Sequence, residues 1–299
     1  MQIPTYVFIA PLATLGIQAV SVVLSNDDGW AEKNIRAFYD ALTSAGESVI
    51  ISAPADNRSG TGSSDSTPGT VTSGCQFNSC PAGSPPYGSS SSNPRFNYVN
   101  SYPVTAMRYG IQNLSPKFFG GAPDIAVAGY NVGANLGSTT LISGTVGAAT
   151  EAALEGIPAI AFSGTSGSQV SYTTATQTYQ TVYAQLSTNV TTTLINSGKP
   201  YLPDGIWLNV NYPTVSSSTC SSASRFKFVL SRINSASSGA AADVRTCGSA
   251  RLPTESSVVG TSGCYASISV GLASNKRDAS AAVQAVVLAK LQPILSCLP

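Results

Sequence analysis

The chain of 299 residues carries a formal net charge of +1, and only 10% of its residues are charged. It therefore lacks the basic surplus that drives binding to nucleic-acid polymers or to acidic membrane surfaces. The sequence contains no histidine, which excludes Ser-His-Asp hydrolysis, phosphohistidine chemistry and histidine-ligated zinc.

Residues 1–19 are largely apolar and carry no charge. The run is too short, and too interrupted by Pro4 and Pro11, to be a comfortable transmembrane helix. It is typical of a secretory signal peptide without a basic n-region, with cleavage after the small residue Ala19. The alternative is a buried first strand of the mature fold. We expect the signal peptide, and hence a secreted protein with no membrane association after cleavage.

Six cysteines support export, because their number is even and none lies in a C-x-x-C arrangement suited to zinc. Cys75 and Cys80 lie close together in a Gly/Ser/Pro-rich stretch and are predicted to form a disulfide. The other four cysteines fall in the last third of the chain, and their pairing stays open. Glycosylation sequons occur at Asn57, Asn113 and Asn189, of which Asn189 is the best candidate.

A short apolar run at residues 22–24 leads into the acidic turn Asn26-Asp27-Asp28-Gly29. An apolar, β-branched run bounded by turn residues is typical of a buried strand. Adjacent carboxylates resist joint ionisation, and a hard cation, which prefers oxygen ligands, removes that cost. The alternative is an ordinary turn in which an aspartate caps the next helix.

The following segments predict a β-α-β unit. Apolar residues at helical spacing indicate a helix over 35–42, and residues 48–54 read as a second strand. Because parallel strands end at the same edge of a sheet, the polar loop 55–64, which contains Ser59, is expected beside the acidic turn. Residues 65–97 are low in complexity and indicate a surface excursion, either a substrate lid or an insertion without function.

The same pattern recurs downstream. A strand over 125–128 leads into an Asn/Gly-rich turn with Asn131, whose amide oxygen suits either a turn or a hard cation. An Ala-rich helix opens at Ser143-Gly144-Thr145, where the side chains can cap the helix or the amides can bind phosphate. A strand over 159–163 follows. Further on, the pattern predicts a helix within 174–194, strands near 206–210, 226–230 and 264–270, and a helix over 279–291.

Five of these motifs, in this order and each at a strand end, resemble the SurE family of metal-dependent phosphatases and nucleotidases. The likeness covers residues 21–165, and residues 208–213 resemble a later strand of the family. It implies a three-layer α/β/α, Rossmann-like fold with a mainly parallel sheet and a C-terminal β-hairpin and helix extension. Residues 20–299 would form one domain, with the metal-binding core at 20–200 and the extension at 201–299.

The resemblance also implies a site. One divalent cation would be bound by oxygen ligands only, which suit Mg²⁺, Mn²⁺ and Ca²⁺ alike. Whether Asp28 is a general base or only a ligand stays open. The implied metal ligands are Asp27, Asp28, Ser59 and Asn131, the implied catalytic residues are Asp27, Asp28 and Asn131, and the implied phosphate-binding residues are Asn135, Ser143, Gly144 and Thr145.

The implied activity is that of an acid phosphatase or 5'(3')-nucleotidase, a hydrolase of phosphoric monoesters acting on a small substrate such as a nucleoside monophosphate. Residues 30–34 and the insertion 65–97 depart from the cytosolic members. Relatives form dimers or larger oligomers, whereas disulfides equally favour a monomer. Two rival functions are a non-catalytic nucleotide- or ligand-binding module and an esterase using Ser143, which the absence of histidine and of a G-x-S-x-G elbow disfavours.

Overall fold

The computed structural model describes residues 19–299, so the predicted signal peptide lies almost wholly outside the described residues. A nine-stranded sheet runs through the chain in the order β3-β4-β2-β1-β5-β6-β7-β9-β8. All neighbours are parallel except the pairs β3–β4 and β7–β9. The strands are β1 (Ser21–Ser25), β2 (Ser48–Pro54), β3 (Tyr87–Ser89), β4 (Phe96–Val99), β5 (Ile125–Val132), β6 (Ala159–Gly164), β7 (Ile206–Tyr212), β8 (Lys227–Ser231) and β9 (Tyr265–Leu272).

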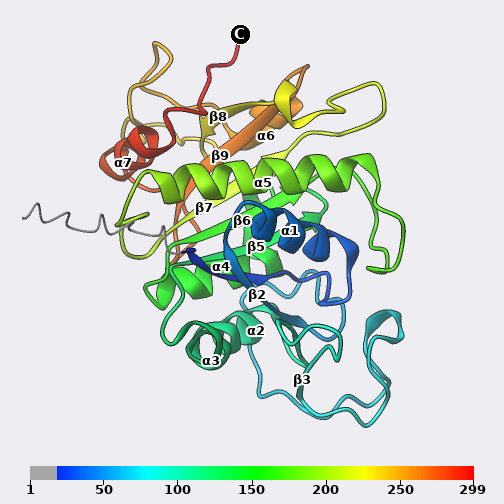
Figure 1. Cartoon of the computed structure of the whole chain (residues 1–299). Helices are drawn as coiled ribbons and strands as arrows, with labels where there is room; N and C mark the ends of the chain where they lie inside the picture. Colours follow the sequence, from blue (N-terminus) through cyan, green and yellow to red (C-terminus); the bar gives the residue numbers. More distant parts are fainter. Residues whose placement is uncertain (1–18) are drawn as a thin grey trace, which may run out of the picture.

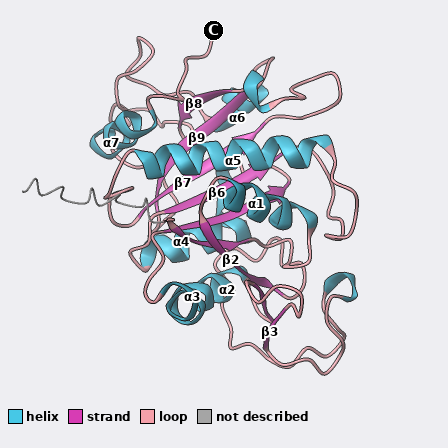
Figure 2. Cartoon of the chain, viewed as in Figure 1, coloured by secondary structure: helices cyan, strands magenta, loops and turns pink. Residues whose placement is uncertain are grey.

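Helices cover both faces of this sheet (Figure 1). One face carries α1 (Lys33–Ser44), α5 (Thr178–Asn196) and α7 (Ala281–Leu291), and the other carries α2 (Pro103–Tyr109), α3 (Ser115–Phe119) and α4 (Gly144–Leu154). The short helix α6 (Glu255–Gly260) packs on β9. A π-helical turn, η2 (Gly110–Leu114), joins α2 to α3, and three 3₁₀ turns are η1 (Gln76–Asn78), η3 (Gly137–Leu141) and η4 (Ala223–Arg225). Figure 2 shows this arrangement by element type.

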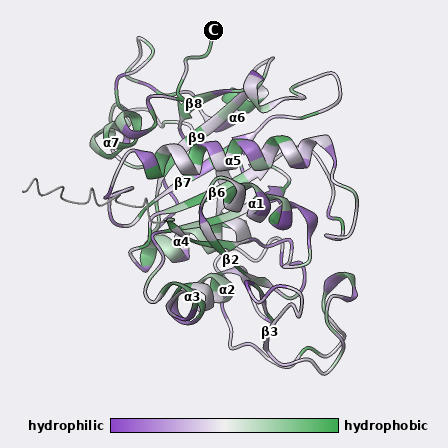
Figure 3. Cartoon of the chain, in the orientation of Figure 1, coloured by the Kyte–Doolittle hydropathy of each residue, from purple (hydrophilic) through white to green (hydrophobic). Residues whose placement is uncertain are grey.

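Alternation along the central strands explains the three layers. Side chains of a strand point to opposite faces in turn, so Val22 and Leu24 join the cluster under α1 and α5 while Val23 joins the cluster under α2 and α4. A parallel strand buried on both faces is apolar throughout. Figure 3 shows this hydrophobic centre, with the more hydrophilic residues on the outer helices and loops. The three-layer, mainly parallel α/β fold is therefore confirmed.

The C-terminal extension differs from the expectation in one respect. Strands β8 and β9 pair in parallel and are connected through α6, so they do not form the expected β-hairpin. The reason is that β9 is also the antiparallel neighbour of β7, which leaves β8 to add at the outer edge. Two disulfides, Cys220–Cys264 and Cys247–Cys297, tie this region together.

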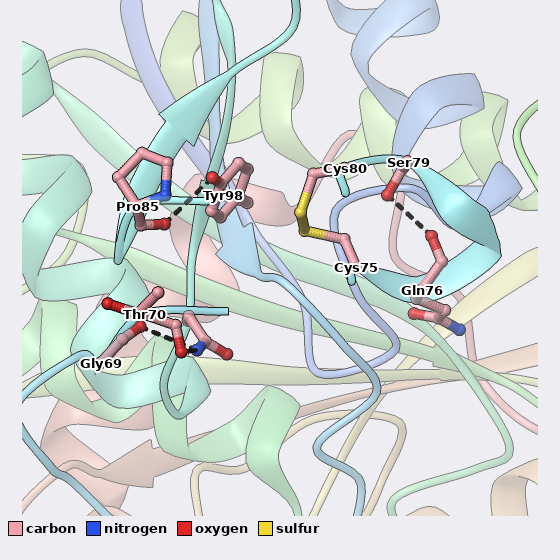
Figure 4. Close-up of a disulfide and its surroundings, with 9 residues drawn as sticks. Gly69, Thr70, Cys75, Gln76, Ser79, Cys80, Pro85 and Tyr98 are labelled. Carbon is pink, nitrogen blue, oxygen red and sulfur yellow. Dashed lines mark hydrogen bonds between the residues drawn. A yellow bond between two sulfur atoms is a disulfide. The ribbon is translucent and has the colours of Figure 1, made fainter. Parts of the chain in front are cut away.

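The excursion at 65–97 is pinned by the disulfide between Cys75 and Cys80, as predicted. Figure 4 shows this bridge with its neighbours, including the hydrogen bond from the Ser79 hydroxyl to the Gln76 carbonyl at 2.7 Å. The backbone amide of Gln76 donates to the carbonyl of Ala55 at 3.1 Å. The disulfide loop is thus attached to the end of β2.

Within residues 19–299, no helix has both the length and the apolar character needed to cross a bilayer.

Candidate active site

The acidic turn follows β1 at the edge where the neighbouring strands β2, β5 and β6 also end. Asn26 shapes this turn: its side-chain amide donates to the Gly29 carbonyl at 3.0 Å, and its Oδ1 accepts from the Gly29 amide at 3.2 Å. Gly29 has a φ of +108°, and a Cβ there would lie 2.0 Å from Oε1 of Gln76. The turn therefore requires glycine, and the disulfide loop packs directly against it.

Asp27 lies at the N-terminal end of α4. Its Oδ1 accepts a hydrogen bond from the Thr145 hydroxyl at 2.5 Å, and the nearby backbone amides of Gly144 and Thr145 act against the rise of its pKa. Its backbone carbonyl accepts from the Arg58 amide at 2.7 Å, which brings the loop after β2 beside it. The positive end of the helix dipole favours a negative charge at this position.

Asp28 is held from two other elements. Its Oδ2 accepts from the Val132 amide at the end of β5 at 3.0 Å, and its Oδ1 accepts from the side-chain amide of Gln169 at 2.5 Å. Gln169 is in turn bonded by Asn57, whose side-chain amide donates to Gln169 Oε1 at 2.8 Å. Asp28 thus connects the ends of β1 and β5 with the loop after β6.

Both carboxyl groups are removed from solvent, with exposures of 2% for Asp27 and 0% for Asp28. Burial raises the pKa of Asp27, and burial together with the negative charge of Asp27 raises the pKa of Asp28. Among residues 19–299, no lysine or arginine forms an ion pair with either group. The two charges therefore lack a protein cation to neutralise them.

Two oxygen donors of the neighbouring segments are free to bind a hard divalent cation. Asn131, next to Val132, is 8% exposed; its amide nitrogen donates to the Gly133 carbonyl at 2.7 Å, and its Oδ1 is buried without a hydrogen-bond partner among residues 19–299. Ser59 is exposed, and its hydroxyl donates to Asn57 Oδ1 at 2.7 Å, which leaves its oxygen lone pairs available. In the described part of the chain no cluster of three or more His, Cys, Asp or Glu side chains is placed to hold a metal, so neutral oxygens would have to complete the ligand set.

The predicted phosphate-binding residues divide into two groups. Ser143 caps α4 through the Val146 amide at 3.1 Å, while the Thr145 hydroxyl bonds to Asp27 and Gly144 lies next to that carboxylate. Asn135 is 4% exposed, and its side-chain amide donates to the Ser163 hydroxyl at 2.8 Å. The Thr145 hydroxyl is thus engaged by the carboxylate of Asp27. Direct contact between phosphate and Asn135, Ser143, Gly144 or Thr145 stays a prediction.

Sequence reasoning missed several residues of this site. Gln169 lies in a polar loop with no signal of its own. Glu32 is fully buried beside the acidic turn, and burial, then the charge of Asp28, raises its pKa to about 8. Asn209 and Asn211 lie in the predicted strand, but no site role is predicted for them from the sequence. Their signal is that they alternate along a buried strand, where an amide side chain needs a hydrogen-bond partner.

The fold and the site together define a doubly wound α/β protein with two buried carboxyl groups at the carboxyl edge of its sheet. The chain belongs to the SurE family: the family model described as "Survival protein SurE" matches residues 22–238.

Curated relatives are consistent with this membership. An acid phosphatase of Yarrowia lipolytica is 38% identical over 205 residues, which are 65% of this chain and 57% of that protein. A 5'-nucleotidase SurE of Polaromonas naphthalenivorans is 32% identical over 196 residues, 66% of each chain. The chain therefore aligns with little more than half of the first relative and about two thirds of the second. The crystal structure of the SurE protein from Aquifex aeolicus has the same fold, with a TM-score of 0.60, 23% identity, and coverage of 84% of this chain and 93% of that one.

Proposed function

We propose that this protein hydrolyses small phosphate monoesters, of the kind used by acid phosphatases and 5'-nucleotidases, at a single divalent-cation site. The observation that carries the proposal is the buried pair Asp27 and Asp28, which has no cationic partner in the described residues. Asn131, whose Oδ1 has no hydrogen-bond partner there, precedes Val132, whose amide bonds to Asp28. Relatives named acid phosphatase and 5'-nucleotidase support the reaction class.

Asp27, Asp28, Ser59 and Asn131 would hold Mg²⁺, Mn²⁺ or Ca²⁺. A cation bound there neutralises phosphoryl charge and lowers the pKa of a water molecule. Phosphoryl transfer depends mainly on positioning and charge neutralisation, so the absence of histidine is no obstacle. Thr145 and the first amides of α4 fix the Asp27 carboxylate, and Val132 and Gln169 fix that of Asp28. These contacts restrict the orientation of each carboxylate.

The first test is hydrolysis of p-nitrophenyl phosphate by protein treated with EDTA and then supplied with each divalent cation. We expect activity to disappear with the chelator and to return with a metal. Asp28→Asn should lower kcat/KM by about three orders of magnitude, since electrostatic stabilisation by a metal contributes several kcal/mol. Activity that is indifferent to EDTA, or a near-normal Asp28→Asn variant, would refute the metal site.

The second candidate is a binding module that holds a nucleotide without turnover. It predicts phosphate binding to the metal-loaded protein but no product with any cation. The four oxygen ligands are all present, which favours the enzyme.

We also propose that the protein is secreted and glycosylated at Asn189. Three disulfides support an oxidising compartment, and Asn189 is exposed on α5. Mass spectrometry of protein from the culture medium should find an N-terminus at Val20 and a glycan on the Asn189 peptide. An intact N-terminus on protein retained in the cell would contradict secretion.

A further inference from the structure

Glu255, the first residue of α6, lies beyond the segment that matches the family model and is fully buried. Its carboxylate reaches two groups near the candidate site. Oε1 accepts a hydrogen bond from the Gly137 amide at 2.7 Å, and Oε2 accepts from the side-chain amide of Asn209 at 2.9 Å. The C-terminal region therefore contacts the segment that follows β5.

Asn209 connects Glu255 to Asn135, because it bonds to both residues. The same side-chain amide of Asn209 donates to the Asn135 carbonyl at 2.9 Å. Asn211, two residues along β7, accepts from the Asn135 amide at 2.8 Å and donates to its carbonyl at 3.2 Å. Residues 135–137 are thus fixed at one end by two asparagines and at the other by Glu255.

The carboxylate of Glu255 has no ion-pair partner among residues 19–299, unlike the other buried acids of the same region. Arg232 contacts Glu255 only through the backbone: its carbonyl accepts a hydrogen bond from the Glu255 amide at 2.7 Å. The guanidinium of Arg232 pairs instead with Asp243 and Asp278. A buried carboxylate without a cation is costly unless hydrogen bonds satisfy it. A neutral side-chain oxygen could accept the hydrogen bond from the Gly137 amide without the cost of burying a charge. The use of a carboxylate here therefore indicates a role beyond holding the fold together.

We propose that Glu255 is a positioning residue for the hydrolytic site: through Gly137 and Asn209 it sets the position of residues 135–137, and so of Asn135. This inference rests on the proposed function, since it assigns Asn135 to the site. Glu255 does not bind the cation itself in this proposal. It should therefore affect turnover and phosphate affinity but not metal affinity.

The test compares the wild type with Glu255→Gln and Glu255→Ala. Glu255→Ala removes both acceptors, so we expect kcat/KM for p-nitrophenyl phosphate to fall about 10- to 100-fold, as for other residues that orient a ligand. Inhibition by inorganic phosphate should weaken, while the Kd for Mn²⁺ should stay close to the wild-type value, because the hydrogen bonds of Glu255 go to Gly137 and Asn209 and to none of the proposed metal ligands. Glu255→Gln keeps an oxygen acceptor for the Gly137 amide but places an amide NH2, a donor, opposite the donating amide of Asn209, so the loss of kcat/KM should be smaller than in Glu255→Ala.

Asp243→Ala is the matched control. Asp243 is a buried carboxylate of the same region, and its side-chain hydrogen bonds stay within residues 232–284. This control should destabilise the fold but leave KM and phosphate inhibition unchanged. If Asp243→Ala changed them as Glu255→Ala does, general destabilisation would explain both, and the positioning role would be refuted.

Hydrogen exchange gives a readout that does not need activity. In Glu255→Ala, the Gly137 amide loses its acceptor, so a peptide spanning 134–141 should exchange faster than in the wild type and in Asp243→Ala. Equal exchange, or equal kcat/KM in Glu255→Ala and the wild type, would overturn the inference. Failure of the proposed function would appear differently, as absence of hydrolysis by the wild type with every cation. If Glu255→Ala does not fold, Glu255→Gln is measured in the same way.

Discussion

Buried aspartates occur in two regions of this molecule, and they differ in whether an arginine neutralises their charge. Asp27 and Asp28, at the carboxyl edge of the sheet, have no lysine or arginine partner in the described residues. Asp243, in the C-terminal region, is paired with both Arg232 and Arg251, the latter at 2.9 Å. Burial is similar, with exposures of 0% for Asp28 and 6% for Asp243.

The pKa values follow this difference. Burial raises the pKa of Asp28, and the charge of Asp27 raises it further. Burial also acts to raise the pKa of Asp243, but hydrogen bonds from Gln284 and Leu252 and the charge of Arg232 outweigh it, so the pKa is lowered. At Asp243 two arginines of the protein supply the opposite charge. At Asp27 and Asp28 no arginine or lysine of the described residues does so, and in the proposed function a bound cation would supply it.

The largest effect expected in the C-terminal region comes from Asp243→Ala. Removing one partner of a buried ion pair leaves the other charge unpaired, so the free energy of unfolding should fall by about 3–5 kcal/mol. Guanidinium titration followed by circular dichroism measures this loss. Activity of the folded fraction should stay at the wild-type level, because Asp243 makes no contact with the site. A variant of unchanged stability would show that the ion pairs contribute nothing.

The disulfides allow a second comparison of the C-terminal region with the site region, for which we expect a smaller difference in stability. Cys220–Cys264 and Cys247–Cys297 close segments of 44 and 50 residues, whereas Cys75–Cys80 closes one of 5. Loop-closure entropy predicts a loss of about 4 kcal/mol for either long bridge and about 2 kcal/mol for the short one.

Paired Cys→Ser variants, compared by their free energies of unfolding, measure this difference. The variant without Cys75 and Cys80 should also change catalysis, since this loop packs on Gly29. Equal stability losses from the long and short bridges, or unaltered turnover without the short bridge, would contradict this account.

The sequence alone was sufficient to predict the three layers of the fold and the edge of the sheet at which the candidate site lies. Strand runs ending in Asp27 or in the turn at Asn131 are local signals, and the order of strands and helices determines which loops meet. The bridge Cys75–Cys80 followed from proximity along the chain. The expected hairpin was wrong because the parallel pairing of β8 with β9 depends on where β9 lies relative to β7.

Residues that reach the site from a distance could not be predicted. Gln169 bonds to Asp28 across 141 positions and Glu255 to Gly137 across 118. Neither has a local pattern that distinguishes it from other polar residues in loops or short helices. Their roles become visible only once the fold brings them to the same edge of the sheet.

The most direct test of the central claim is calorimetric titration of Mn²⁺ into the chelator-treated wild type, Asp28→Asn and Asp243→Ala. We predict one cation per chain for the wild type and for Asp243→Ala, and loss of binding in Asp28→Asn. Removing one carboxylate takes away a charged ligand, and neutral oxygens bind a hard cation more weakly. Equal Mn²⁺ binding by Asp28→Asn and the wild type would contradict the account, because the uncompensated carboxylates would then not be the metal site.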